Sequence, residues 1–398
     1  MNSPNDLLST NTRRGPARCC VVLAAASLAA SCASARAADS AATRPAAPFM
    51  GAYVHMEMVY KKDADPAAQR EAISRAMDRF KASGLRVVMP YATTTSGTAW
   101  YDSDVIPVRQ AKDWDPLRAF VDEARKRGLA VWPVVCVVPS GGEKSPGGIL
   151  LQHPEWALRD KNDKPIGYLS PCNPQARDHM VSVVKEIVTK YQTEGVLLDY
   201  LRFPSAVTRP DPDSLARFEK EYPGDKTADE AVKRQHLQAF KEKNLTELAR
   251  RISVELRKVK PDVRIGLYTW GPQVTRSHNV AQMWPEWAAR GYLDMVSVSG
   301  YCYRDNYGEK YLQVFEDRMT EAARLLKEAR APAELTLTLG VKTSHGQVKN
   351  AAEIDDYLRI AHRVGIRGVA IFTWSYLEPY LDDVMKAGYL ERFAAPKP

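Results

Sequence analysis

The sequence predicts an α/β protein, a (β/α)8 TIM barrel with long loops at the C-terminal face of its strands. Three observations support this fold. A unit made of a helical segment, a glycine and a short apolar strand recurs, with clear copies at 82–89, 126–132 and 193–198. Strand and helix patterns alternate eight times along the chain, which is typical of a barrel. The longest connections follow strands, and in a barrel this puts them all on one face.

The predicted strands are short apolar runs without alternation, so both of their faces are expected to be buried, as in a parallel sheet. Glycine favours the left-handed conformation that ends a helix, and the link to the next strand is short. In the third copy of the unit we therefore expect Gly195 to end the preceding helix. In chain order, the eight predicted strands are 51–58, 85–91, 129–138, 195–200, 263–270, 294–299, 335–341 and 367–374.

The predicted helices have their own start signals and periodicity. Asp115 with Pro116, and Asn173 with Pro174, combine a capping residue with a proline in the first helical turn. Apolar residues recur at spacings of three and four over 237–259 and build one apolar stripe. In chain order, the eight predicted helices are 66–82, 115–127, 174–193, 235–259, 280–290, 308–330, 351–364 and 380–393. The long connections are then 92–114, 139–173 and 201–234, with a shorter one at 300–307.

The N-terminus is typical of a targeting segment rather than of the barrel. Arg13, Arg14 and Arg18 form a basic region, and the apolar stretch that follows, 19–30, is too short to span a bilayer. We expect a signal peptide over 1–37, a linker over 38–48 and the barrel domain over 49–395. A second option is a lipoprotein signal that ends before Cys32, which would anchor the protein to a membrane through a lipid on that residue. Either option predicts export to the periplasm or the outside.

Charge and cysteine content argue against a nucleic-acid-binding protein and against a fold built on zinc sites or a disulfide framework. The net charge of +8 falls to +5 when the four arginines and the one aspartate of 1–37 are removed, and no dense basic stripe is present, so no nucleic-acid partner is expected. The domain keeps Cys136, Cys172 and Cys302, which are widely spaced and form neither a zinc pattern nor a disulfide framework. The sequence leaves a single disulfide among them open.

Asp199 is the first candidate for a catalytic residue. It follows a run of three apolar residues, 196–198, that predicts a strand buried on both faces. A charge at the end of such a strand is costly unless it is paired or used, and in a barrel this end of the strands carries the chemistry. The alternative is structural, with Asp199 pairing with Arg202 to seal the strand end.

Other acidic and aromatic residues follow the predicted strands and should gather at the same mouth. Sugar rings pack on flat aromatic faces and their hydroxyls bond to carboxylates and arginines, while two carboxylates can cleave a glycosidic bond. We take Glu57 and Glu378 as the leading partners of Asp199, with Asp102, Asp104 and Asp305 as weaker ones. The predicted substrate-binding residues are Arg202, Tyr91, Trp100, Trp270, Tyr301, Tyr303 and Trp374.

Several common catalytic motifs are absent from the sequence. There is no nucleophile elbow, phosphate-binding loop or His-Glu-x-x-His helix. The glycine-rich loop that a doubly wound open sheet, the alternative fold, often carries after its first strand is also missing. His55, His278 and His345 lack the local spacing of metal ligands. We expect neither a catalytic metal nor a cofactor.

Four segments together resemble glycosyl-hydrolase-like family 10, bacterial envelope proteins related to a denuded-peptidoglycan glycosidase. The segment 195–204 is similar to the family's Gly-Ile-His-Leu-Asp-Tyr-x-Arg-Tyr-Pro signature, and 114–129, 153–156 and 169–177 resemble other parts of it. The resemblance covers about 50–380 and implies a TIM barrel, an exported protein and a glycan substrate. The chain departs from the family pattern at Leu197, where the signature has a histidine, and at Ser170, where a neighbouring segment has an aspartate.

We therefore expect an exported glycoside hydrolase that acts on a cell-envelope or other polysaccharide, with Asp199 as nucleophile or base. Arg202 would orient Asp199 and keep it ionised, because a nearby cation lowers the pKa of a carboxyl. Strand 263–270 ends without a glutamate, so the second carboxylate stays open between Glu57 and Glu378. One rival is a non-catalytic glycan-binding barrel. The other is a metal-dependent hydrolase or deacetylase, which would need a histidine cluster at the mouth.

Overall fold

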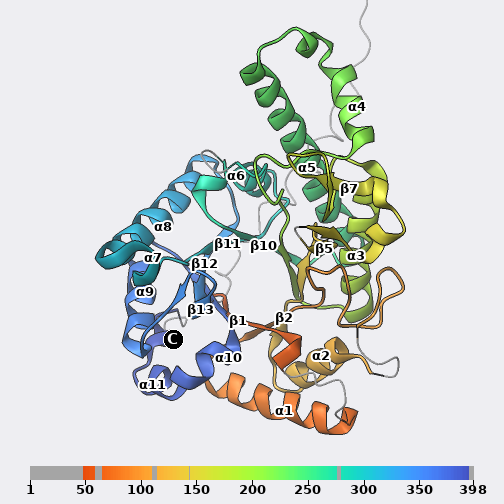
Figure 1. The fold of residues 1–398 in the computed structure, drawn as a ribbon. Coiled ribbons are helices and arrows are strands. Elements are labelled where there is room, and N and C mark those ends of the chain that lie inside the picture. The colour runs from red at the N-terminus through yellow and green to blue at the C-terminus, as the bar shows by residue number, and fades with distance from the viewer. Residues whose placement is uncertain (1–47, 59–64, 110–113, 143, 276–278, 394–398) are drawn as a thin grey trace, which may run out of the picture. The chain divides into compact units, whose positions relative to one another are not determined.

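A computed structural model describes residues 48–58, 65–109, 114–142, 144–275 and 279–393 (Figure 1). The predicted signal peptide, most of the linker and Cys32 lie outside these residues. The described part is a ring of parallel strands with helices around the outside. This confirms the predicted barrel rather than the open sheet.

Eight strand positions form the ring, and all eight were predicted. Their bounds are β1 (Met50–Val54), β2 (Val87–Pro90), β3 (Ala130–Val131) with β4 (Val134–Cys136), β9 (Gly195–Asp199), β10 (Arg264–Thr269), β11 (Met295–Ser299), β12 (Glu334–Gly340) and β15 (Gly368–Phe372). The hydrogen-bonded order is β3-β2-β1-β15-β12-β11-β10-β9-β4. The two ends of this order, β3 and β4, are consecutive in the chain, so the sheet closes on itself.

The third strand position is broken in the middle, because Pro133 has no backbone N–H to donate. Before the break, β3 pairs with β2, and the Trp132 N–H donates to Val88 O over 2.9 Å. After it, β4 pairs with β9, and the Leu197 N–H donates to Pro133 O over 2.9 Å. The break therefore divides one predicted strand into two short ones without opening the ring.

Helices follow the strands as predicted, and the expected caps are in place. The side chains of Asp115 and Asn173 accept hydrogen bonds from backbone N–H groups of the first turns of α2 and α3. The outer helices are α1 (Pro66–Ala82), α2 (Pro116–Lys126), α3 (Pro174–Tyr191), α5 (Glu230–Val259), α6 (Trp284–Ala289), α8 (Tyr311–Glu328), α9 (Ala351–Arg363) and α11 (Leu381–Lys386).

The long connections follow the C-terminal ends of strands, as expected, but they are not plain loops. The segment 201–234 contains the helix α4 (Pro212–Glu221), which the sequence analysis left as a connection. With the first half of α5 it extends beyond the ring (Figure 1). The remaining connections hold the hairpins β5 (Gly141–Gly142) with β6 (Ser145–Pro146), β7 (Ala157–Arg159) with β8 (Pro165–Leu169), and β13 (Lys342–Thr343) with β14 (Gly346–Gln347), and the short helices α7 (Arg304–Tyr307) and α10 (Trp374–Leu377).

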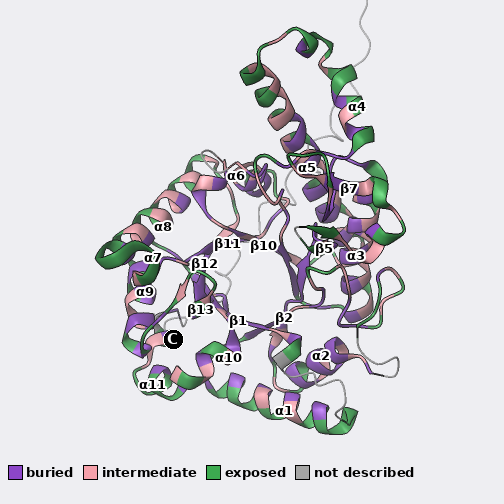
Figure 2. Cartoon of the chain, viewed as in Figure 1, coloured by how far each residue is buried: buried purple, intermediate pink, exposed green. Residues whose placement is uncertain are grey.

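Apolar side chains fill two layers, one inside the ring and one between strands and helices, and most residues of the ring strands are buried (Figure 2). Strand residues alternate between the layers. On β1, Tyr53 belongs to the inner cluster, whereas Ala52 and Val54 belong to the outer one. The largest inner side chain is Trp132, which packs edge-on against Phe49 with ring centroids 5.0 Å apart.

The expectation that Gly195 ends a helix is wrong. Gln192, with φ of 49°, is the left-handed residue after α3, and Gly195 is already the first residue of β9. A Cβ at position 195 would lie 2.2 Å from Trp132 Cε2. Glycine is therefore required there because the indole of Trp132 occupies the space of a side chain. The same unit at 82–89 and 126–132 behaves as expected, with φ of 84° at Gly84 and 67° at Gly128.

The three cysteines of the domain are free and buried. Cys136 lies on β4 beside Asp199, Cys172 precedes α3, and Cys302 follows β11. The single disulfide that the sequence left open is thus not formed among them.

Candidate active site

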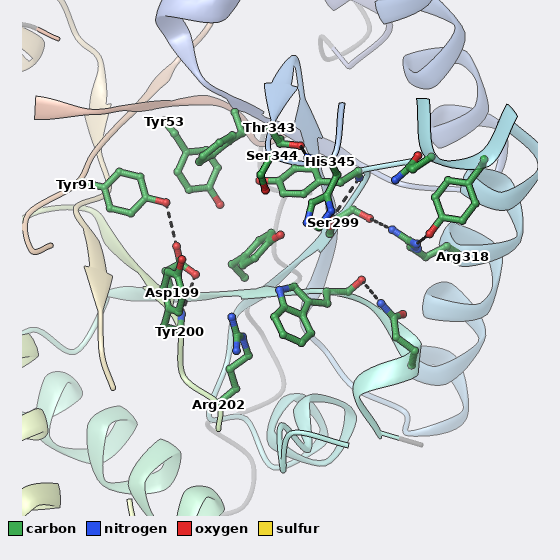
Figure 3. A pocket seen from close by; sticks show the side chains of 17 residues that line it. Tyr53, Tyr91, Asp199, Tyr200, Arg202, Ser299, Arg318, Thr343, Ser344 and His345 are labelled. Carbon is green, nitrogen blue, oxygen red and sulfur yellow. Dashed lines mark hydrogen bonds between the residues drawn. The ribbon is translucent and has the colours of Figure 1, made fainter. Parts of the chain in front are cut away.

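A cavity of about 760 Å³ opens at the C-terminal ends of the strands (Figure 3). Its wall comes from most of the ring, since strand ends and the segments that follow them each contribute side chains. The lining residues are Tyr53, Tyr91, Asp199, Tyr200, Arg202, Tyr268, Trp270, Gln273, Ser299, Tyr301, Asn306, Tyr307, Arg318, Thr343, Ser344, His345 and Phe372. Asp199 is the only carboxylate among these described lining residues.

Asp199 ends β9 and is 5% exposed. Its two carboxylate oxygens have separate partners. Oδ2 accepts a hydrogen bond of 2.9 Å from the Tyr91 hydroxyl, and Oδ1 accepts one of 2.7 Å from the Tyr200 backbone N–H (Figure 3). The carboxylate is therefore held in one orientation from two sides.

The backbone turns sharply directly after this carboxylate. Tyr200 has φ of 54°, a left-handed conformation that is uncommon for a residue with a side chain. This turn is how the Tyr200 N–H comes to donate to the side chain of its own neighbour. Such outliers cluster at functional sites, where the surrounding structure holds them.

Burial raises the pKa of Asp199 above the usual range, because desolvation disfavours the charged form. The hydrogen bonds from Tyr91 and Tyr200 and the positive charge of Arg202 act in the opposite direction. The sequence analysis expected Arg202 to set this balance. Arg202 does favour the ionised form, but burial outweighs it.

Arg202 does not form an ion pair with Asp199, since no contact between them within 4 Å is present among the described residues. Its guanidinium lies 3.7 Å from the ring centroid of Trp270 and 5.0 Å from that of Tyr200. Its Nη1 donates to the backbone oxygen of Phe203 over 3.2 Å. The alternative in which the two side chains pair only to seal the strand end is therefore wrong.

Aromatic rings line the cavity in an unbroken series from β2 to β10. Ring centroids are 6.0 Å apart between Tyr91 and Tyr53, 5.4 Å between Tyr53 and Phe372, 5.8 Å between Phe372 and Tyr301, and 6.1 Å between Tyr301 and Tyr268. Such a wall presents flat apolar faces together with hydroxyl groups, a combination that suits the C–H faces and hydroxyls of sugars.

The structure brings five of the predicted residues to the cavity and leaves three aromatic ones elsewhere. Tyr91, Asp199, Arg202, Trp270 and Tyr301 line the wall. Trp100, Tyr303 and Trp374 do not.

Each of these three aromatic residues is buried against protein. Trp100 is 3% exposed and has Arg109 over its ring, and Trp374 is 4% exposed and packs 5.0 Å from Phe80. Tyr303 is 1% exposed and lies behind Tyr301. Their positions favour packing over a role as sugar platforms. The sequence analysis assigned residues to the mouth by their distance from strand ends, and that distance does not tell which way a side chain points.

Neither of the two leading partners of Asp199, Glu57 and Glu378, is among the residues that line the cavity. Glu57 is exposed in the turn η1 (Met56–Met58), directly after His55, whose ring stacks 4.8 Å from that of Tyr91. Its charge contributes to the raised pKa of Cys136, after burial and the charge of Asp199, so both carboxylates act on the same thiol. Glu378 is half-buried in η7 (Glu378–Tyr380) after α10 and does not line the cavity.

The three weaker candidates are not part of the cavity wall either. Asp104 pairs with Lys190 of α3 over 2.8 Å, and the backbone oxygen of Asp102 accepts from the same lysine. Asp305 lies in α7 and is not among the lining residues. Asp102 and Asp104 thus contact Lys190 of α3 rather than the cavity.

Residues 57–356 match the family described as glycosyl hydrolase-like 10. The chain belongs to this family. It is 25% identical over 239 residues to the glycosyl hydrolase DigH of Escherichia coli K12 and 22% identical over 237 residues to the glycosyl hydrolase YngK of Bacillus subtilis. These alignments cover 53% and 56% of this chain but only 50% and 44% of the two relatives. The chain thus spans about half the length of the curated relatives it matches.

Solved structures with a similar fold include barrels of glycosidases. The glycoside hydrolase domain of PgaB (BpsB) from Bordetella bronchiseptica superposes with a TM-score of 0.66 at 14% identity and covers 88% of this chain and 100% of that one. The catalytic domain of beta-amylase from Paenibacillus polymyxa has a TM-score of 0.60 at 11% identity, with coverages of 88% and 99%. At these identities the likeness shows the fold alone.

The glycosyl hydrolase-like 10 signature can now be placed on the site. It contributes β9, Asp199, Tyr200 and Arg202, which are the strand, the carboxylate and two further side chains of the cavity wall. Leu197, where the signature has a histidine, is fully buried in the inner cluster. The departure at Leu197 therefore lies inside the barrel rather than on the cavity wall.

Several lining residues were not predicted. Tyr53 and Phe372 are the inward-facing residues near the ends of β1 and β15, and strict alternation along those strands would have found them. Arg318 comes from α8, and no feature of the sequence distinguishes it from the other charged residues of that helix.

The histidines and acidic residues of the described part of the chain do not form a candidate metal site. Within those residues there is no group of three or more His, Cys, Asp or Glu side chains that could hold an ion. His345 lines the cavity and His55 stacks on Tyr91, while His278 lies outside the described residues.

Proposed function

We propose that this protein hydrolyses glycosidic bonds in a cell-envelope or other extracytoplasmic polysaccharide. Its membership of the glycosyl hydrolase-like 10 family supports a glycosidase. The observation that carries the proposal is the setting of Asp199, a buried and doubly hydrogen-bonded carboxylate in an aromatic-lined cavity at the catalytic end of a barrel.

Asp199 would act as the nucleophile or as the base that activates water. Either role needs the ionised form, which the Tyr91 and Tyr200 hydrogen bonds and the Arg202 charge favour against burial. A second acid must protonate the leaving oxygen. We propose Glu57 for this role ahead of Glu378, because it lies two residues after His55, whose ring stacks on that of Tyr91, and because its charge raises the pKa of Cys136, which lies beside Asp199.

We also propose that the protein is exported. The support is the basic and apolar pattern of 1–37 and, as the alternative, a lipid on Cys32. Among the helices of the described residues, none is long and apolar enough to cross a bilayer.

The test compares Asp199→Asn with Asp211→Asn on a panel of polysaccharides. Asp211 is also fully buried, but it caps α4 outside the cavity, where asparagine caps equally well. We expect Asp199→Asn to lower turnover by at least about 10³-fold with little change in glycan affinity, as for loss of a group that acts in the transition state. Asp211→Asn should keep near wild-type turnover. Equal turnover in the wild type and Asp199→Asn would end the assignment.

A non-catalytic glycan-binding barrel is the second candidate, because the described residues of the cavity wall include a single carboxylate. It predicts glycan binding without release of reducing ends from any polysaccharide of the panel. It also predicts that Trp270→Ala weakens binding more than Asp199→Asn does.

A further inference from the structure

We propose that Gln282 is a positioning residue for the cavity, because it holds together the two segments that present Arg202 and Trp270 to the substrate. The inference rests on the proposed function, since it concerns the same cavity, but it does not depend on which glycan binds there. Gln282 is fully buried and is not among the lining residues. It therefore acts through those two side chains rather than on the substrate.

Arg202 and Trp270 meet beyond the end of the strand pairing that connects their segments. The parallel pairing of β9 with β10 ends where Leu198 lies beside Leu267. Arg202 and Trp270 follow these last paired residues, and the guanidinium still lies 3.7 Å from the ring centroid of Trp270. Contacts other than strand pairing must therefore hold the two segments at this distance.

The side chain of Gln282 bridges the two segments. Its Nε2 donates to the backbone oxygen of Leu201, the residue before Arg202, and to that of Tyr268 near the end of β10, each over 3.2 Å. Both acceptors are carbonyl oxygens, so the amide can present only its nitrogen to them. One amide thus continues the connection of β9 with β10 past the last paired residues.

The neighbours of Gln282 bond to the same two segments. The backbone oxygen of Val280 accepts from the Phe203 N–H over 3.0 Å, and Nε1 of Trp284 donates to the backbone oxygen of Gly271 over 3.4 Å. The stretch 280–284 is therefore bonded to the chain on both sides of position 202 and on both sides of position 270.

The fold alone gives little reason for a glutamine at this position. Its Oε1 is buried and has no hydrogen-bond partner in the part of the chain that the structure describes, which is costly. The preceding Ala281 has φ of 61°, a left-handed conformation that is uncommon for a residue with a side chain. Features of this kind cluster at functional sites, where the surrounding structure holds them. An apolar side chain would avoid the unpaired oxygen but would lose the bridge.

The bridge gives the cavity a wall that is ordered before the glycan arrives. Arg202 acts on Asp199 through its charge, and Trp270 offers a flat face to a sugar, so both depend on where their backbones lie. Holding these backbones in place in the free protein avoids an entropy cost on binding. Loss of the bridge should therefore weaken glycan binding without removing any group that contacts the glycan.

Hydrogen–deuterium exchange of the free protein tests the bridge directly. Gln282→Met keeps the approximate size of the side chain but cannot donate. We expect the amides of 201–203 and 269–271 to exchange about fivefold faster or more, the effect of losing one neutral hydrogen bond. Unchanged exchange in both segments would overturn the inference. If Gln282→Met does not fold, Gln282→Asn, which is one methylene shorter and should lose at least one of the two bonds, takes its place.

Thr193→Val is the matched control for the exchange measurement. Thr193 is also fully buried, and its hydroxyl donates to the backbone oxygen of Gly195 over 3.0 Å, at the end of β9 far from the cavity. The variant loses a buried hydrogen bond to the backbone, as Gln282→Met does. It should leave the exchange of 201–203 and 269–271 unchanged, and faster exchange there in both variants would contradict a specific role of Gln282.

Binding measurements then test whether the bridge acts through Trp270. Titration calorimetry of the Asp199→Asn protein would use the oligosaccharide that the wild type cleaves, or chitotetraose if it cleaves none. We expect Gln282→Met to weaken binding about 5- to 10-fold when Trp270 is present, and less than about twofold when Trp270 is already alanine. Equal losses in the two backgrounds would overturn the inference. A wild type that cleaves nothing would refute the hydrolase proposal alone, because neither exchange nor binding requires turnover.

Discussion

The Tyr91 hydroxyl donates a 2.9 Å hydrogen bond to Asp199 Oδ2, and this bond spans the width of one strand of the ring. Tyr91 follows β2 and Asp199 ends β9, and the broken third strand lies between them in the ring. The two groups affect each other's titration. The bond lowers the pKa of Asp199, and burial followed by the Asp199 charge raises the pKa of Tyr91. Tyr91 is therefore a positioning residue for the carboxylate as well as part of the wall.

Replacing Tyr91 with phenylalanine should shift the pH profile of hydrolysis. The hydroxyl stabilises the ionised form of Asp199, so its loss raises the pKa of the carboxyl. Since a nucleophile or base must be ionised, the acidic limb of kcat/KM should move to higher pH. On that limb, activity should fall about 10- to 100-fold, the worth of a hydrogen bond to a charged group. A pH–rate profile of both proteins measures this.

Tyr101→Phe is the matched control. Tyr101 is fully buried and donates over 2.8 Å to Glu186 of α3, away from the cavity. Its loss should lower stability to a similar degree but leave the acidic limb unmoved. A shift to lower pH in Tyr91→Phe, or the same shift in both variants, would contradict the role of Tyr91.

Replacing Gly195 with alanine tests how the barrel interior is packed. The new Cβ would lie 2.2 Å from Trp132 Cε2, and the indole is confined by Phe49 and by Gly266. We expect a loss of about 1–3 kcal/mol in the free energy of unfolding, as for overpacked cores. Urea denaturation would measure it. Gly224→Ala, where a Cβ meets nothing within 4 Å, should change stability by less than about 0.5 kcal/mol. Similar losses in both variants would refute the packing explanation.

The fold could be predicted from sequence because its determinants are local. Apolar runs, capping residues such as Asp115 and Asn173, and glycines with positive φ such as Gly84 each act within a few residues. Gly195 does not follow this pattern, because the requirement for glycine at this position is not local. The residue that requires a glycine there, Trp132, comes from a neighbouring strand position and can be found only in three dimensions.

The site was predicted less completely for the same physical reason. Asp199 was found because a buried strand that ends in a charge is unusual in sequence alone. Whether Trp270 faces the cavity while Trp374 faces Phe80 depends on the direction of a side chain after its strand ends. Arg318 could not be found at all, because it reaches the cavity from an outer helix rather than from a strand end.

The remaining carboxylate can be assigned by comparing Glu57→Gln with Glu378→Gln. Loss of a general acid costs about 10²- to 10⁴-fold when the leaving group needs a proton, and much less when it does not. We expect Glu57→Gln to lose this much activity on polysaccharide but to keep most of it on a dinitrophenyl glycoside, whose leaving group departs without protonation. Glu378→Gln should stay within about twofold of the wild type on both substrates. Reducing-end and dinitrophenolate assays measure the two rates.

The two substrates also distinguish catalysis from a structural effect. A Glu57→Gln protein that is merely misfolded would lose both activities together, whereas a missing acid spares the activated glycoside. Glu57 is exposed in a short turn, so its replacement should leave stability nearly unchanged. If Glu378→Gln instead shows the selective loss, the acid belongs to the segment after β15.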